Sequence, residues 1–243
     1  MLASDQKLPV AGGAEKRAYV RSMFADIAPT YDRLNRILSL SLDLRWRRQA
    51  VDRLDWERVP DGIYLDLCAG TLDLAAILAR RPHFSGRVVG ADFVRPMLEL
   101  GRHKADRLAP VTADALALPF RDAAFDGAMV GWGLRNLIDL DGGLLEVARV
   151  LKPGARLAIL DVATPVREPM RALYLFYFER VLPQVGRFIS RHRTAYNWLP
   201  ESTRVFPQPA ELSRRVVAAG FEGVGYRLFL GGVTALHVGT RAG

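Results

Sequence analysis

The chain has 243 residues, a single cysteine and a formal net charge of +8, and half of its residues are hydrophobic. This length suffices for one α/β domain with additional helices, and one cysteine excludes a disulfide within the chain. No apolar run reaches the ~18 residues of a membrane-spanning helix, and we find no signal peptide, so we expect a cytoplasmic protein.

The positive charge is carried mostly by arginines spread along the chain, because lysine occurs only at positions 7, 16, 104 and 152. A solvated basic surface explains this distribution best, and attraction to an anionic membrane is the alternative. Without a basic block or an aromatic–basic motif we expect no nucleic-acid partner.

Residues 16–57 are predicted to be helical. Val20, Met23, Phe24 and Ile27 recur at helical spacing, and Pro29 should end that first helix. We therefore expect an N-terminal helical lid segment over residues 1–58, followed by one domain over residues 59–243.

From residue 59 onward, short apolar strands alternate with helices. The strands are continuous apolar runs, which is typical of a parallel sheet covered by helices on both faces. The fold class is therefore α/β and Rossmann-like, with a mostly parallel seven-stranded sheet and a closing C-terminal strand pair. The predicted strands are 63–68, 87–92, 110–113, 125–131, 155–162, 226–229 and 235–239. The predicted helices are 74–81, 95–107, 140–151 and 210–219, with a turn at 152–154.

The first predicted strand contains Asp66 and runs into a turn of small residues, Ala69, Gly70 and Thr71. The second strand ends in Asp92, which Phe93 follows. Small residues let the backbone approach a ligand, and an acid at the next strand end takes ribose hydroxyls. One glycine makes a poor pyrophosphate cradle, so we expect an adenosyl ligand without phosphates, S-adenosylmethionine.

Two further elements extend this ligand site. Asp114 follows the third strand and can accept from an adenine amino group, while Ala115 leaves space. Gly131 ends the fourth strand and allows a close approach. The predicted cofactor-binding residues are thus Asp66, Ala69, Gly70, Thr71, Asp92, Phe93, Asp114, Ala115 and Gly131.

Arg135 and Asn136 place a guanidinium and an amide at the centre of the open sheet, where reacting groups usually lie. A structural salt bridge is the alternative for Arg135. No spacing of histidines and acids suits a metal ion, so we expect none. Cys68 has no neighbouring base, so we expect a small buried residue.

Four segments resemble the menaquinone/ubiquinone C-methyltransferases: residues 24–35 (FADIAPTYDRLN), 133–136 (GLRN), 196–202 (YNWLPES) and 231–237 (GGVTALH). The resemblance spans nearly the whole chain. It implies a class I S-adenosylmethionine-dependent methyltransferase with an antiparallel C-terminal strand pair. It also implies methyl transfer to a ring carbon of a prenylated quinol, most of all demethylmenaquinol.

The same resemblance implies catalytic roles. Arg135 would stabilise a phenolate or orient a water, Asn136 would fix the ring, and Tyr31 would close over the sulfonium. Core packing of a helix is the alternative for Tyr31.

Leu72 departs from the family, whose members usually have glycine at this position. We expect its side chain to crowd the methionine end of the cofactor or to resist a positive φ. Two other functions stay open: a related methyltransferase acting on another aromatic or secondary metabolite, and a catalytically weakened partner in a quinone-biosynthesis complex.

Residues 166–200 are rich in aromatic residues and arginines. They fit a hydrophobic tunnel for a prenyl tail, in a helical insertion that contacts the inner face of the cell membrane peripherally. A lid or a helix pair in a homodimer fits equally. The residues concerned are Tyr174, Phe176, Tyr177, Phe178, Phe188, Tyr196 and Trp198, with Arg171, Arg180, Arg187, Arg191 and Arg193.

Overall fold

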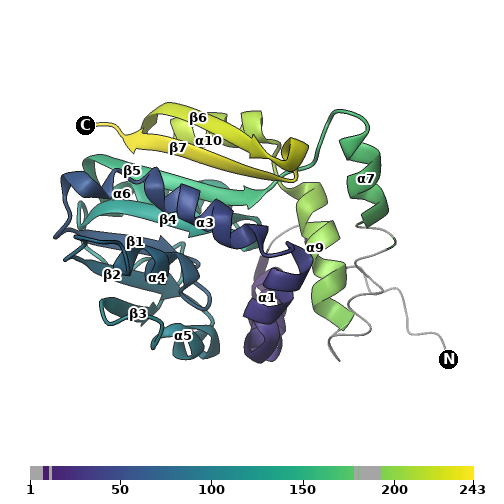
Figure 1. Cartoon of the computed structure of the whole chain (residues 1–243), viewed down its shortest axis with the longest axis horizontal. Coiled ribbons are helices and arrows are strands. Elements are labelled where there is room, and N and C mark those ends of the chain that lie inside the picture. The colour runs from purple at the N-terminus through teal and green to yellow at the C-terminus, as the bar shows by residue number, and fades with distance from the viewer. Residues whose placement is uncertain (1–7, 11–12, 178–179, 181–192) are drawn as a thin grey trace.

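The structure is a computed structural model that describes residues 8–10, 13–177, 180 and 193–243 (Figure 1). In the range 193–243, side chains are described from residue 198 onward. Several aromatic-segment residues named above therefore lie outside the described residues: Phe178, Phe188, Arg187 and Arg191, together with the side chains of Tyr196 and Arg193.

The N-terminal part is helical, as predicted. Pro29 ends the first helix because it lacks the backbone N–H that would continue it. The elements are α1 (Gly13–Ile27), the 3-10 turn η1 (Ala28–Thr30), α2 (Tyr31–Leu38), α3 (Leu42–Asp52) and η2 (Trp56–Arg58).

Seven strands form one sheet in the order β3-β2-β1-β4-β5-β7-β6. The first five strands pair in parallel, and β7 runs antiparallel to both β5 and β6, which confirms the predicted fold class. The strands are β1 (Ile63–Leu67), β2 (Arg87–Asp92), β3 (Leu108–Thr112), β4 (Phe125–Gly131), β5 (Leu151–Val162), β6 (Phe221–Phe229) and β7 (Thr234–Arg241). The strand order reverses between β1 and β4, where ligands of open α/β sheets bind.

Helices cover both faces of the sheet (Figure 1). On one face, α3 and α4 (Asp73–Ala79) pack on Tyr64 of β1 and Met129 of β4. On the other, α6 (Leu140–Val150) and α10 (Pro209–Ala218) pack on Leu65 and Val130. Each central strand is thus apolar on both faces, which is why its sequence is a continuous apolar run.

Three predicted boundaries are wrong. β5 begins at Leu151, so residues 152–154 belong to the strand, where a register shift opposite β4 accommodates them. Helix α5 (Arg95–Gly101) ends earlier than predicted, and β6 begins at Phe221, with an irregular register between Glu222 and Gly225.

The remaining helices lie beside the N-terminal ones. α1 runs next to α9 (Arg193–Val205), where Val20 and Met23 pack on Trp198, and α7 (Met170–Phe176) lies near the end of the sheet (Figure 1). Among the described helices, none combines the length and the hydrophobicity needed to cross a bilayer.

Candidate active site

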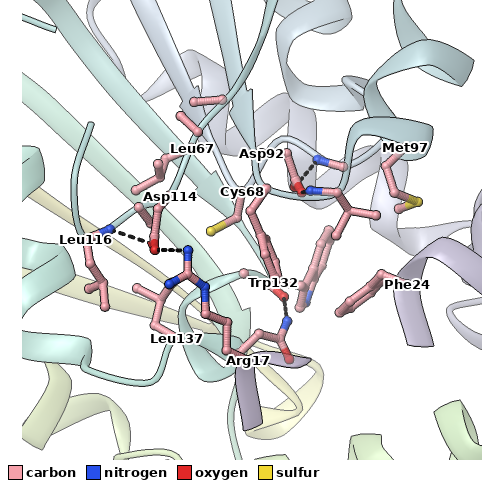
Figure 2. Close-up of a pocket in the computed structure, with 18 of the residues that line it drawn as sticks. Arg17, Phe24, Leu67, Cys68, Asp92, Met97, Asp114, Leu116, Trp132 and Leu137 are labelled. Carbon is pink, nitrogen blue, oxygen red and sulfur yellow. Dashed lines mark hydrogen bonds and ion pairs between the residues drawn. The ribbon is translucent and has the colours of Figure 1, made fainter. Parts of the chain in front are cut away.

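Two cavities adjoin each other at the carboxyl ends of the parallel strands. The first, which we call the strand-end cavity, lies over β1, β2 and β4 and is closed by α1 and α2 (Figure 2). Most of the predicted cofactor-binding residues line it. Its walls include Arg17, Phe24, Tyr31, Cys68, Gly70, Asp92, Phe93, Met97, Asp114, Ala115, Gly131, Trp132 and Asn136.

Asp92 fixes the loop after β1 to the end of β2. One carboxylate oxygen accepts from the Gly70 amide at 2.8 Å and the other from the Val94 amide at 2.8 Å. Burial raises the pKa of Asp92 to about 6, although the backbone hydrogen bonds oppose that shift. The Phe93 amide also donates to this carboxylate, so about one of its four lone pairs remains for a hydroxyl group.

Asp114 is already occupied by groups of the chain itself. Its Oδ1 accepts from the Leu116 amide at 3.0 Å, and its Oδ2 pairs with the Arg17 guanidinium of α1 at 2.6 Å (Figure 2). An adenine amino group would therefore compete with Arg17 for this carboxylate. Sequence reasoning missed Arg17, because nothing in a helix pattern shows that it reaches the end of β3.

Three predicted wall residues do not reach the cavity, which corrects the expectation. Ala69 is buried in the core, and the Thr71 hydroxyl donates to the Asp32 carboxylate. Asp66 is buried and accepts from the Ala75 amide at 2.9 Å, and burial raises its pKa to about 8. These residues hold the shape of the turn and the start of α4 from behind.

Leu72 adopts the positive φ that its position requires, at +63°, and its side chain is fully buried. It packs into the core on the side where Gly90 and Gly101 leave room, so it does not line the strand-end cavity. The expectation that Leu72 crowds the ligand is therefore wrong.

Cys68 lines the strand-end cavity, with its sulfur directed into it (Figure 2). The residue is of intermediate exposure, while its thiol is buried, so the expectation of a small buried residue is met in part. Burial of the thiol, with the nearby carboxylate of Asp92, raises its pKa well above the usual value. The thiol is therefore neutral and unreactive at neutral pH.

The second cavity, which we call the apolar cavity, has a volume of about 460 Å³ and lies between α2, α3, α7 and the end of β5. Tyr31 and Trp132 line both cavities, so they form the wall between them. The other walls include Leu38, Leu42, Trp46, Arg47, Arg135, Val162, Met170, Leu173, Tyr174, Tyr177, Leu199 and Val233.

Arg135 faces the apolar cavity and is held by an ion pair. Its Nη1 donates to Asp161 Oδ1 at 3.0 Å and also to the Trp132 carbonyl. Asp161 is buried and also accepts from the Leu134 amide at 3.1 Å. Arg135 is thus both salt-bridged and a wall residue. Asp161 was missed, although its position at the end of an apolar strand repeats that of Asp92.

Asn136 lines the strand-end cavity and is tied to α9, since its Oδ1 accepts from Trp198 Nε1 at 2.9 Å. Lys16 of α1 donates to the carbonyls of Arg135 at 3.2 Å and Leu137 at 2.7 Å. Burial lowers the pKa of Lys16. Helices α1 and α9 therefore fix the segment that carries Arg135 and Asn136, two of the three predicted catalytic residues.

An ionic network joins the N-terminal helices to the sheet domain. Lys104 bridges Asp32 at 2.7 Å and Asp73 at 2.6 Å, and Arg36 pairs with Asp73 at 2.7 Å and with Asp43. Within the described ranges, no cluster of three or more His, Cys, Asp or Glu side chains is arranged to hold a metal ion.

Comparisons with known proteins bear on this arrangement. A model of the ubiE/COQ5 methyltransferase family matches residues 13–241. The chain is 48% identical to the demethylmenaquinone methyltransferase of Thermus thermophilus, over 90% of this chain and 100% of that protein. It is 39% identical to the ubiquinone/menaquinone biosynthesis C-methyltransferase UbiE of Geobacter sulfurreducens, over 98% and 94% of the two chains. A SAM-dependent methyltransferase from Thermotoga maritima has the same fold, with a TM-score of 0.63 at 20% identity, over 90% of this chain and 98% of that one.

Proposed function

We propose, from the premise that the chain belongs to the ubiE/COQ5 methyltransferase family, that it methylates a ring carbon of a prenylated quinol, with demethylmenaquinol as its substrate. The protein is a methyltransferase and its cofactor is S-adenosyl-L-methionine. That cofactor supplies the methyl group from a sulfonium when it is bound. The choice of demethylmenaquinol follows the name of the Thermus thermophilus relative.

The residues of the strand-end cavity fit this cofactor. Asp92 keeps a free lone pair for a ribose hydroxyl, and Asp114 can accept from the adenine amino group once Arg17 releases it. Gly70 and Gly131 leave the backbone approachable, and Ala115 leaves space beside the ring system. We assign cofactor binding to these five residues and to Phe93, while Asp66, Ala69 and Thr71 shape the turn from behind.

The observation that carries the proposal is the shared wall between the two cavities. Tyr31 and Trp132 border both the strand-end cavity and the apolar cavity. A quinol ring beside this wall would present its carbon to the methyl group, while the apolar cavity takes the prenyl tail. Holding the two reactants in contact accounts for much of the rate enhancement that such a transfer needs.

The ring carbon becomes nucleophilic when the neighbouring hydroxyl loses its proton, which a water would take. This carbon would then receive the methyl group of the bound cofactor, which would remain as the neutral thioether, and the ring would lose the proton of the methylated carbon to water. Arg135 cannot take a proton at working pH, so it stabilises the oxygen's negative charge. Asp161 holds the guanidinium in place, Asn136 positions the ring, and Tyr31 closes over the reacting groups.

We further propose that, within the segment 1–58, α1 and α2 form the lid, because they border the cavities while α3 packs on the sheet. Three side chains of the apolar cavity form an exposed apolar rim: Leu40 is 83% exposed, Leu173 60% and Leu230 49%. This rim would contact the inner face of the cell membrane peripherally, and the net charge of +8 favours anionic headgroups. A helix pair in a homodimer is the alternative role of residues 166–200.

The quinone profile of a strain that lacks the encoding gene tests the function. Accumulation of a demethylated quinone, reversed by the intact gene, is the expected result, and an unchanged profile would overturn the assignment. Calorimetry with S-adenosylhomocysteine tests the cofactor site separately. Because Leu72 lies outside the strand-end cavity, it leaves the cofactor site intact. This favours an active enzyme over a catalytically weakened partner protein.

A further inference from the structure

Arg47 of α3 is a buried cation without a hydrogen-bond partner among the described residues. Arg47 is 5% exposed, and its Nε is buried without a hydrogen-bond partner. The nearest carboxylate oxygens are Asp43 Oδ2 at 3.5 Å and Asp73 Oδ2 at 3.8 Å, both beyond good hydrogen-bond geometry. Arg47 lines the apolar cavity, with its guanidinium beside Trp132.

The carboxylates next to Arg47 are satisfied by other groups. Asp43 accepts from Arg36 and from the Ser39 hydroxyl, and Asp73 accepts from Arg36 and Lys104. They balance the charge of Arg47 without using its donors. A buried guanidinium that leaves its donors unpaired costs free energy, which an oxygen ligand in the cavity would recover.

The guanidinium of Arg47 stands at the wall between the two cavities. Its central carbon lies 4.6 Å from the centroid of the Trp132 ring. Its Nη1 would lie 3.4 Å from a Cβ on Gly131, whose backbone lines the strand-end cavity. Trp132 therefore has one arginine over its ring and another, Arg135, bonded to its carbonyl.

We propose that Arg47 is a second oxygen-binding residue of the substrate site, so that Arg47 and Arg135 each donate to one of the two ring oxygens of a hydroquinone. The inference rests on the proposed function, which assigns Arg135 to one ring oxygen, and it assigns Arg47 to the second ring oxygen. A para-diol carries its oxygens on opposite sides of the ring and therefore needs two separate donors, and Arg47 and Arg135 both line the apolar cavity beside Trp132. Arg47 then lowers the pKa of the hydroxyl that it contacts, because it stabilises the oxyanion.

The test compares three variants in the full-length protein. Arg47→Met removes the guanidinium, Arg47→Lys keeps the charge but loses the fork, and Arg48→Met removes the same charge from the adjacent exposed position of α3. The substrates are a short-chain prenylated 1,4-dihydroxynaphthalene, kept reduced, and its counterparts that lack one hydroxyl.

With the diol, Arg47→Met should lower kcat/KM by about 10- to 100-fold, the loss of one charge-assisted hydrogen bond. The pH midpoint of kcat should rise by about one unit, a change that a purely structural role would not cause. For both quantities, Arg47→Lys should give values between those of the wild type and Arg47→Met, and Arg48→Met should match the wild type. Calorimetric affinity for S-adenosylhomocysteine should change less than about twofold in all three.

The substrates with one hydroxyl decide the pairing. Removing the oxygen that Arg47 contacts should lower the kcat/KM of the wild type by about 10-fold or more. The same removal should lower the kcat/KM of Arg47→Met little further. If Arg47→Met lowered kcat/KM by the same factor for the diol and for both monohydroxy compounds, the inference would be overturned. An unchanged pH midpoint of kcat in Arg47→Lys and Arg47→Met would also overturn it. If the wild type bound no S-adenosylhomocysteine or did not methylate the diol, the proposed function itself would fail, which is a different outcome.

A prenylated naphthol provides a measurement that does not depend on turnover. Its absorbance distinguishes naphthol from naphtholate, so the pKa of the bound compound can be titrated on each variant. That pKa should be lowest on the wild type and should rise by about one unit on Arg47→Met. Equal values on both proteins would also overturn the inference.

Discussion

The side chain of Leu72 fills the space above the α-carbon of Gly90. A Cβ on Gly90 would lie 2.0 Å from Leu72 Cδ2, and one on Gly101 would lie 3.0 Å from Leu72 Cβ. Positive φ costs a branched residue about 1–2 kcal/mol, and burying a leucine side chain contributes about 1.5–3 kcal/mol. The two glycines thus allow a leucine where its relatives are expected to carry glycine.

Replacing Leu72 separates backbone strain from packing. Leu72→Ala should lower the free energy of unfolding by about 2–4 kcal/mol, because it leaves a cavity and keeps the positive φ. Leu72→Gly should be at least as stable as Leu72→Ala, since glycine accepts this φ without strain. Urea denaturation of both variants measures the order, and a clearly less stable glycine variant would contradict the argument.

Gly90→Ala should be destabilising only while Leu72 is present. The added methyl group cannot fit beside Leu72 Cδ2, so we expect a loss of about 1–3 kcal/mol. In the Leu72→Ala background the same change should cost much less. The double-mutant cycle should therefore give a coupling above about 0.5 kcal/mol, and additive effects would count against the contact.

Cofactor affinity should depend on the ionisation of Asp92, whose pKa burial raises to about 6. The ionised carboxylate accepts from hydroxyl groups, and protonation removes acceptor capacity. Affinity for S-adenosylhomocysteine should therefore be full above pH 6 and fall as the pH drops through 6, by up to about tenfold per unit. Calorimetry between pH 5 and 8 measures this, and Asp92→Asn should bind weakly with a flatter pH profile.

Arg17→Met should strengthen cofactor binding. The ion pair with Asp114 must open before an adenine amino group can use that carboxylate, and the strand-end cavity holds only about 60 Å³ as it stands. The Arg17 side chain is 53% exposed, so the pair contributes little and we expect a gain of about two- to fivefold. Arg21→Met, on the same helix, is the control. Weaker binding by Arg17→Met would instead mean that Arg17 contacts the cofactor directly.

Lys104→Met should loosen the N-terminal helices from the sheet domain. Lys104 bridges Asp32 of α2 and Asp73 of α4, and its loss leaves two partly buried carboxylates with fewer partners. Amide hydrogen exchange in residues 13–38 should become several-fold faster, with little change in β1 and β4. Arg95→Met removes an exposed ion pair from the helix that precedes Lys104 and should leave exchange unchanged. Equal protection in both variants would show that other contacts hold these helices.

The sequence by itself determined the fold class, and it predicted most of the residues that line the strand-end cavity. Continuous apolar runs predict buried parallel strands, because such strands are covered on both faces, and Asp92 and Asp114 are recognisable as acids that end strands. Gly70 and Gly131 are likewise recognisable as small residues at strand ends, and both line the strand-end cavity. These features are local, so their spacing along the chain carries the information.

Only the tertiary structure decided which side of a turn each residue faces and which distant groups meet. Asp66 of the first predicted strand and Ala69 and Thr71 of the predicted turn do not line the cavity. Leu72 turns into the core because Gly90 leaves room there. Arg17, Arg47 and Asp161 reach the site from a helix, another helix and a distant strand. No periodicity specifies such meetings, since they follow from how the helices pack on the sheet.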